Sequence, residues 1–321
     1  MKEYIIGKNE AGQRFDKYIF KLLKNAGTGL IFKQLRNKNI VLNGKKAKGN
    51  EILKENDSVR IFMSDDTINK FTGGSLHISK TGFRLDVIYE DDDILLASKP
   101  VGVLSQKSSD KDISMNEYLI EYLTDNGFGK ENLATFKPSF CNRLDRNTSG
   151  LMIAGKSLRG LQKMSEIIKD RSIHKFYLTI VKGIVEKKSV IKGYLRKDEK
   201  NNKVVIYDNP VKDSYEIHTE YEPLATKDDM TLLKVRLITG KTHQIRAHLA
   251  GISHPVLGDF KYGDKVFNDK YGEKKQLLHS YQVVFPKLDD FPDISEKSFN
   301  TPYPVNFTKY FKETILSNQI Y

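Results

Sequence analysis

The chain has 321 residues, of which 39% are hydrophobic, a size and composition typical of a soluble protein with two folding units. It has no apolar run of transmembrane length and no apolar stretch at its start, so we expect no membrane partner, no signal peptide and a cytoplasmic location. Its single cysteine, Cys141, excludes an intrachain disulfide and a multi-cysteine zinc site.

The positive charge is concentrated near the N-terminus. The formal net charge is +12, and residues 1–60 contribute +8 of it, from 14 Lys or Arg against 6 Asp or Glu. The remaining residues hold 39 against 35, a balance of +4. This distribution favours a polyanionic partner for a small N-terminal module.

Apolar spacing predicts the elements of that module. Phe15, Ile19, Leu22 and Leu23 recur at helical spacing, and a second short helix fits residues 30–37. A strand at residues 40–42 is followed by Asn43-Gly44, which predicts a tight hairpin turn, and another strand fits residues 56–61.

Residues 63–80 show no sustained period and contain Gly73-Gly74, so they are interpreted as a linker. Two apolar runs around an acidic turn in residues 85–98 then predict a hairpin. Further strands are expected at residues 151–154, 176–181, 231–238 and 283–285, with a helix at 158–168. Strands outnumber helices without regular alternation, which favours an α+β domain on a largely antiparallel or mixed sheet.

Four segments of this larger region carry candidate chemistry. Residues 142–151, NRLDRNTSGL, place the carboxylate of Asp145 between two arginines in a run of turn-forming residues. The others are residues 99–102 (KPVG), residues 174–183 (HKFYLTIVKG) and residues 239–249 (TGKTHQIRAHL). Taken singly, the first three segments would be a surface turn, a Pro-Gly turn and a strand with a core aromatic.

Taken in chain order, the four segments resemble the K-P-x-G, H-R-L-D-x-x-T-S-G, K-x-Y-x-A-x-V-x-G and G-R-T-H-Q-I-R-x-H motifs of the RluA-type (RluA/RluC/RluD) pseudouridine synthases. Within that family the chain resembles the RluC-like members most closely. The resemblance implies that Asp145 is catalytic, that Tyr177 is the active-site tyrosine, and that Arg246 pairs with the aspartate and orients it. It also implies substrate or RNA contacts by Arg143, Lys99, His243 and Gln244. Arg143 would fill the gap left by a flipped nucleotide, or bind a phosphate.

The basic module resembles the S4 RNA-binding domain, although a basic helix pair can also be a solvated face. That resemblance implies phosphate contacts by Arg14, Lys33, Arg36, Lys45, Lys46 and Lys48. The expected domains are an S4-like domain at residues 1–64, a linker at 65–82 and a pseudouridine synthase catalytic domain at 83–321.

Three positions depart from the family pattern: Asn142 stands where His is usual, Lys241 replaces Arg, and Ser280 replaces Ala. These changes bear on substrate placement more than on chemistry, because Asp145, Tyr177 and Arg246 are intact. His243 and His248 are expected to hydrogen-bond within the fold, since no further metal-ligand motif accompanies them.

The expected activity is therefore isomerisation of uridine to pseudouridine in RNA, with large-subunit (23S) ribosomal RNA or a pre-ribosomal particle as the expected substrate. The reaction has no redox change, so we expect no metal, no cofactor and no nucleotide. A monomer is expected. Transfer RNA is an alternative substrate, and a non-catalytic S4-type RNA-binding or ribosome-assembly protein is an alternative class.

Overall fold

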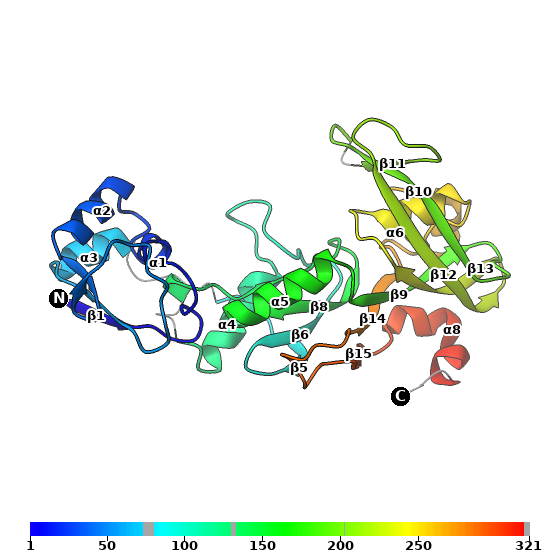
Figure 1. Cartoon of the computed structure of the whole chain (residues 1–321). Helices are drawn as coiled ribbons and strands as arrows, with labels where there is room; N and C mark the ends of the chain where they lie inside the picture. The colour runs from blue at the N-terminus through cyan, green and yellow to red at the C-terminus, as the bar shows by residue number, and fades with distance from the viewer. Residues whose placement is uncertain (73–79, 130–132, 202, 318–321) are drawn as a thin grey trace.

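The structure, a computed structural model, describes residues 1–72, 80–129, 133–201 and 203–317, and within them the strands form two sheets (Figure 1). The smaller sheet belongs to the N-terminal residues. The larger one is built from residues 86–300 and holds the helices that follow residue 114 on its two faces.

The N-terminal sheet has four antiparallel strands in the order β1-β4-β2-β3. Its elements are β1 (Lys2–Ile5), α1 (Phe15–Leu22), α2 (Thr28–Arg36), β2 (Ile40–Leu42), β3 (Lys45–Lys46) and β4 (Ser58–Ile61). Phe15, Ile19 and Leu35 form one buried core with Val59, as helical spacing of apolar residues requires. Asn43 and Gly44 have φ of 50° and 71°, which confirms the predicted hairpin turn.

Residues 65–72 differ from the expected irregular linker, because Asp65–Thr72 form helix α3. The Ser64 side chain accepts a hydrogen bond from the Thr67 amide, and two aspartates occupy the first turn, which stabilises a helix N-terminus. Ile68 is 1% exposed and belongs to the N-terminal core. Because α3 has only one buried side chain in two turns, its sequence shows no helical spacing of apolar residues that could have predicted it. Gly73-Gly74 lie outside the described residues.

The large sheet has eleven strands, and nine of them follow the order β11-β10-β12-β13-β9-β14-β8-β6-β5. They are β5 (Asp86–Glu90), β6 (Ile94–Lys99), β7 (Ser139–Phe140), β8 (Ser149–Gly155), β9 (His174–Lys182), β10 (Ser189–Asp198), β11 (Lys203–Tyr207), β12 (Tyr215–Lys227), β13 (Met230–Leu237), β14 (Leu278–Val284) and β15 (Ser298–Asn300). The pairing of β14 with β8 is parallel and the other pairings are antiparallel. The expected α+β class with a mixed sheet is confirmed.

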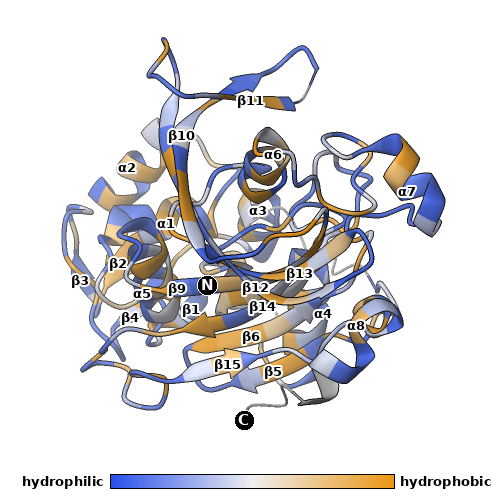
Figure 2. Cartoon of the chain, turned by 90° about the vertical axis from the view of Figure 1, so that its right-hand side faces the viewer, coloured by the Kyte–Doolittle hydropathy of each residue, from blue (hydrophilic) through white to orange (hydrophobic). Residues whose placement is uncertain are grey.

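Helices cover both faces of this sheet (Figure 1). The apolar side chains of α4 (Met115–Asp125) and α6 (Gln244–Gly251) share one core, while α5 (Leu158–Lys169) and α8 (Val305–Ser317) pack on the opposite face. A short helix, α7 (Lys265–Tyr271), follows α6. Figure 2 shows the hydrophobic colouring concentrated along the strands of the large sheet.

Strand β9 shows how the sheet presents the site. Because successive side chains on a strand point to opposite faces, Tyr177 and Val181 lie on the face of α4 and α6, whereas Leu178 and Ile180 lie on the other. Tyr177 is thereby placed on the same face as Arg246 of α6. None of the helices in the described part of the chain has the length and hydropathy needed to cross a membrane.

Candidate active site

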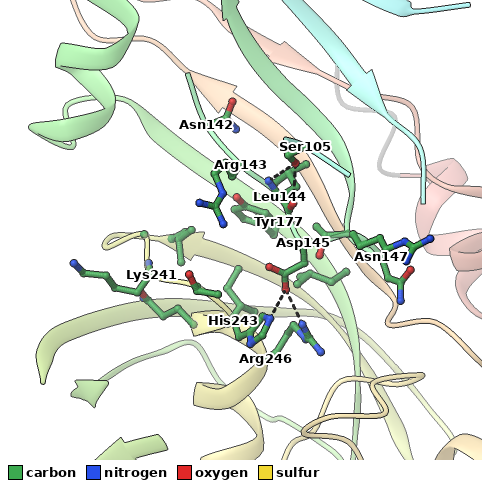
Figure 3. A pocket seen from close by; sticks show the side chains of 18 of the residues that line it. Ser105, Asn142, Arg143, Leu144, Asp145, Asn147, Tyr177, Lys241, His243 and Arg246 are labelled. Atoms are coloured by element: carbon green, nitrogen blue, oxygen red, sulfur yellow. Dashed lines mark hydrogen bonds and ion pairs between the residues drawn. The ribbon is translucent and has the colours of Figure 1, made fainter. Parts of the chain in front are cut away.

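Asp145 lies in a tight turn between β7 and β8, at a cavity of about 830 Å³ (Figure 3). Its carbonyl accepts a hydrogen bond from the Thr148 amide (3.0 Å), which confirms the predicted turn. The Ser105 hydroxyl donates to the Leu144 carbonyl (2.8 Å) and accepts from the Leu144 amide (3.0 Å). These bonds fix the backbone beside Asp145, whose side chain is 23% exposed and lines the cavity.

The segment after β6 holds the other side of this loop. The Lys99 ammonium donates to the carbonyls of Arg146 and Pro100, both at 2.9 Å, and the Gly102 amide also donates to the Arg146 carbonyl. Burial lowers the pKa of Lys99 to about 8, although the nearby Asp145 charge opposes this shift. Lys99 is 0% exposed, so the structure departs from the predicted RNA contact. Its observed partners are the backbone carbonyls of Arg146 in the loop and of its own neighbour Pro100.

Strand β14 and the residues before it hold the end of the loop. Gln276 donates to the Thr148 hydroxyl (2.9 Å), and His279 hydrogen-bonds to the Ser149 hydroxyl (2.8 Å). Gly150 has a φ of +106°, and a Cβ there would lie 2.1 Å from the Ser280 carbonyl oxygen. Only glycine fits at this position, which gives the Ser-Gly pair of the motif a physical reason.

A chain of charges joins the loop to α6. Arg246 Nη1 donates to Asp145 Oδ2 at 2.7 Å, while its Nε and Nη2 bind the two oxygens of Asp259 at 2.7 and 2.9 Å. The Asp259 side chain is 0% exposed and that of Arg246 is 7% exposed. Burial by itself would lower the pKa of Arg246, but the two carboxylates raise it above its ordinary value. The bidentate pair therefore orients a permanent cation toward Asp145.

His243 approaches the same carboxylate oxygen. Its Nε2 lies 3.9 Å from Asp145 Oδ2, and its Nδ1 hydrogen-bonds to the Tyr262 hydroxyl (2.9 Å). Burial lowers the pKa of His243, against the opposing effect of the Asp145 charge, so the ring is neutral at neutral pH. His243 and Arg246 both meet Oδ2, which leaves Oδ1 as the oxygen turned away from the guanidinium.

Tyr177 lines the cavity from β9 and is 6% exposed. Burial raises the pKa of its phenol to about 12, a hydrogen bond with Ser280 lowers it, and the Asp145 charge raises it. The phenol is therefore protonated at neutral pH. Ser280, one of the positions that departs from the family pattern, contacts this phenol from the neighbouring strand.

Several predicted side chains are used inside the fold. Gln244 accepts from the Thr239 hydroxyl (2.9 Å) and donates to Thr219 and the His218 carbonyl, so its amide is engaged on both sides, although we expected an RNA contact. Asn142 accepts from the Ile153 amide (2.8 Å) and anchors the loop. His248 hydrogen-bonds to Thr219 (3.0 Å), as predicted. The described residues contain no cluster of three potential metal ligands.

The remaining predicted contacts are exposed cations. Arg143 is exposed and lines the cavity. The N-terminal cations are solvent-exposed and do not line it: Arg14, which pairs with Asp16, and Lys33, Arg36, Lys45, Lys46 and Lys48.

Ser105 and Gln276 were not predicted as site residues from the sequence, and Asp259 and Tyr262 were given no role. Asp259 and Tyr262 follow the fourth motif closely in the chain, which was a usable signal for them. Ser105 and Gln276 meet the loop through long-range contacts that spacing does not reveal.

Comparisons with known proteins point to one family. The sequence profile described as RNA pseudouridylate synthase matches residues 93–251. An RNA pseudouridine synthase of Mycoplasma genitalium is 31% identical over 304 residues, covering 92% of this chain and 93% of that protein. The ribosomal large subunit pseudouridine synthase C of Pasteurella multocida is 28% identical, covering 89% and 86%. The structure of human RNA pseudouridylate synthase domain containing 4 is similar in fold, with a TM-score of 0.57 at 20% identity over 72% of this chain and 92% of that one.

Proposed function

The chain belongs to the RNA pseudouridine synthases, and we propose that it converts uridines of large-subunit ribosomal RNA to pseudouridine with Asp145 as the catalytic residue. One observation supports the assignment of Asp145. Its carboxylate lies in a cavity and is oriented by Arg246, whose guanidinium is itself bound by Asp259.

The geometry fits the bonds that must change. Isomerisation breaks the bond from uracil N1 to the ribose C1′ and joins C5 to the same carbon, while C5 loses a proton and N1 gains one, with no oxidation or reduction. A carboxylate beside the ribose can act as nucleophile or base for these steps. Because Arg246 and His243 both approach Oδ2 of Asp145, we assign Oδ1 to the substrate.

The cavity also suits a flipped nucleotide. A uridine inside folded RNA must leave its stack to reach Asp145, and an enzyme compensates with stacking and shape in its pocket. A volume of about 830 Å³ is large enough for one nucleoside. Tyr177 supplies an aromatic wall, and its neutral phenol can donate a hydrogen bond. Arg143, exposed at the cavity, is placed to occupy the gap in the RNA or to bind a phosphate.

We assign RNA affinity to the N-terminal module, an S4-like domain at residues 1–64 onto which α3 also packs, and catalysis to a domain at residues 83–321. The exposed lysines and arginines of α2 and the β2–β3 hairpin support this, because phosphate contacts need solvent-facing cations. Relatives named ribosomal large subunit pseudouridine synthase C support the choice of RNA. We expect a cytoplasmic monomer.

The proposal is tested by mapping pseudouridines in ribosomal and transfer RNA from cells that lack the gene. We expect one or more large-subunit positions to lose the modification and to regain it when the wild-type gene is restored. Loss confined to transfer RNA would contradict the substrate assignment. An unchanged map of both RNAs would contradict the proposal as a whole.

A further inference from the structure

An aromatic ring and a lysine meet at the edge of the Asp145 cavity. Tyr215, at the start of β12, is 58% exposed, and Lys241 Nζ lies 3.8 Å from the centre of its ring. Lys241 lines the cavity, and in Figure 3 its side chain extends away from Asp145. Tyr215 therefore lies outside the space for the flipped uridine, yet is joined to it by one side chain.

Further positive charge gathers beside this pair. Lys175 of β9 also lines the cavity, and its Nζ lies 3.4 Å from where a Cβ on Gly240 would stand, next to Lys241 in the chain. Burial lowers the pKa of Lys175, and the positive charge of Arg171 lowers it further. Glu216, the carboxylate next to Tyr215, hydrogen-bonds to His218 at 2.8 Å. Cations held this close together favour an added anion.

An exposed aromatic ring among cations is the usual chemistry for a nucleotide of single-stranded RNA, since the ring stacks on the base and the cations bind the phosphate. Flipping one uridine into the cavity necessarily leaves its neighbours in the strand at the cavity edge. Lys241 and Lys175 line the cavity and can reach the phosphate of such a neighbour, whereas the N-terminal cations do not line it.

We infer that Tyr215, Lys241 and Lys175 form a subsite for the nucleotide that flanks the target uridine in the same RNA strand, with its base on Tyr215 and its phosphate on the lysines. This inference rests on the proposed function. It also gives a role to Lys241, which stands where the family usually has Arg, because its ammonium lies both at the cavity and against the Tyr215 ring.

The test is fluorescence anisotropy of the full-length chain with two probes. One is a short labelled oligouridylate, and the other is a ribose-phosphate oligomer of the same length without bases. We expect wild type to bind the oligouridylate more tightly. Tyr215→Ala should weaken that probe by about 5- to 150-fold and leave the base-free probe unchanged, while Tyr215→Phe should match wild type. Lys241→Ala should weaken both probes and reduce the salt slope by about 0.7.

Two control variants each break a pair of an aromatic ring and a cation that lies away from the proposed subsite. Tyr207 stacks with Arg196 on the β10–β11 hairpin and does not line the cavity, so Tyr207→Ala should bind both probes as wild type does. Lys270, which lies over the Tyr271 ring at 4.9 Å and is 54% exposed, provides the lysine control as Lys270→Ala. Circular dichroism melts confirm that each variant is folded.

The inference is overturned if Tyr215→Ala keeps the wild-type preference for the oligouridylate, if Tyr207→Ala loses as much, or if wild type binds neither probe at low salt. The anisotropy experiment measures RNA binding alone, so its result is independent of whether the chain forms pseudouridine. A chain that fails to modify large-subunit RNA but shows the Tyr215 dependence would contradict only the proposed function. A chain that modifies it without that dependence would contradict only the subsite.

Discussion

Beside Asp145, the cations Arg246 and Lys99 are buried and bind fixed partners, whereas the cations of α2 and of the β2–β3 hairpin in the N-terminal module face solvent. Arg246 is held between two carboxylates and Lys99 between two backbone carbonyls. Lys33, Arg36 and Lys45 are exposed. A buried cation with fixed partners can orient one group, while an exposed cation can bind any phosphate that reaches it. Lysine and arginine therefore orient the catalytic group in one region and are expected to bind RNA in the other.

The largest effect is expected where a buried charge loses its partner. Asp259→Ala would leave Arg246 with Asp145 alone, and breaking a buried ion pair costs about 3–5 kcal/mol. Denaturant unfolding should show this loss. As the contrast in the N-terminal module, Arg60→Ala breaks a pair with Glu3 in which the two side chains are 44% and 39% exposed, and it should cost less than about 1 kcal/mol. Equal losses of unfolding free energy in the two variants would contradict the distinction between buried and exposed ion pairs.

The buried Lys99 should make the stability of the protein depend on pH, in contrast to the exposed lysines of the N-terminal module. Its pKa is lowered from 10.5 in the unfolded chain to about 8 in the folded protein, so between these values the unfolded chain binds more protons. Stability should therefore rise as pH increases from 8 to 10.5, by at most about 1.4 kcal/mol per pH unit. Lys99→Met should lack this rise when unfolding is measured across the window. The exposed-lysine variant Lys33→Met should keep it, and the same pH slope in Lys99→Met as in wild type would contradict the role of burial.

Ser105 tests whether the loop needs its backbone partners. Ser105→Ala leaves the buried Leu144 amide and carbonyl without the hydroxyl that binds both, a loss of about 1–3 kcal/mol. Turnover should fall as well, because Asp145 follows Leu144 directly. Ser172→Ala, which removes a hydroxyl bound to Asp170 outside the cavity, serves as the matched variant. Wild-type stability and turnover in Ser105→Ala would show that the loop is held by other contacts.

The smallest effect on stability is expected in the N-terminal module. Replacing both Lys33 and Arg36 by Ala should leave unfolding within about 0.5 kcal/mol of wild type, since both side chains are exposed. The slope of log affinity for RNA against log salt should fall by about 0.7–0.9 for each lost phosphate contact. Filter binding at several salt concentrations measures it. An unchanged slope would mean that this face of α2 does not touch RNA.

The sequence predicted those parts of the fold and site that depend on local chemistry. The Asn43-Gly44 hairpin and the turn around Asp145 follow from residues that favour these backbone conformations, and both were correct. Helix α6 was missed, because its residues are buried on all sides and give no amphipathic period. Lys99 and Gln244 were expected at the RNA, yet the structure buries them. Their partners come from distant strands and loops, which residue spacing does not encode.

The central claim, that Asp145 is the catalytic residue, is tested most directly by the rate at which purified Asp145→Asn forms pseudouridine in unmodified large-subunit ribosomal RNA. RNA affinity is measured beside it. Proton transfer by a positioned side chain contributes about 10²–10⁴ in rate, so we expect a loss of at least that size with RNA affinity close to wild type. Turnover by Asp145→Asn close to the wild-type rate would contradict the account.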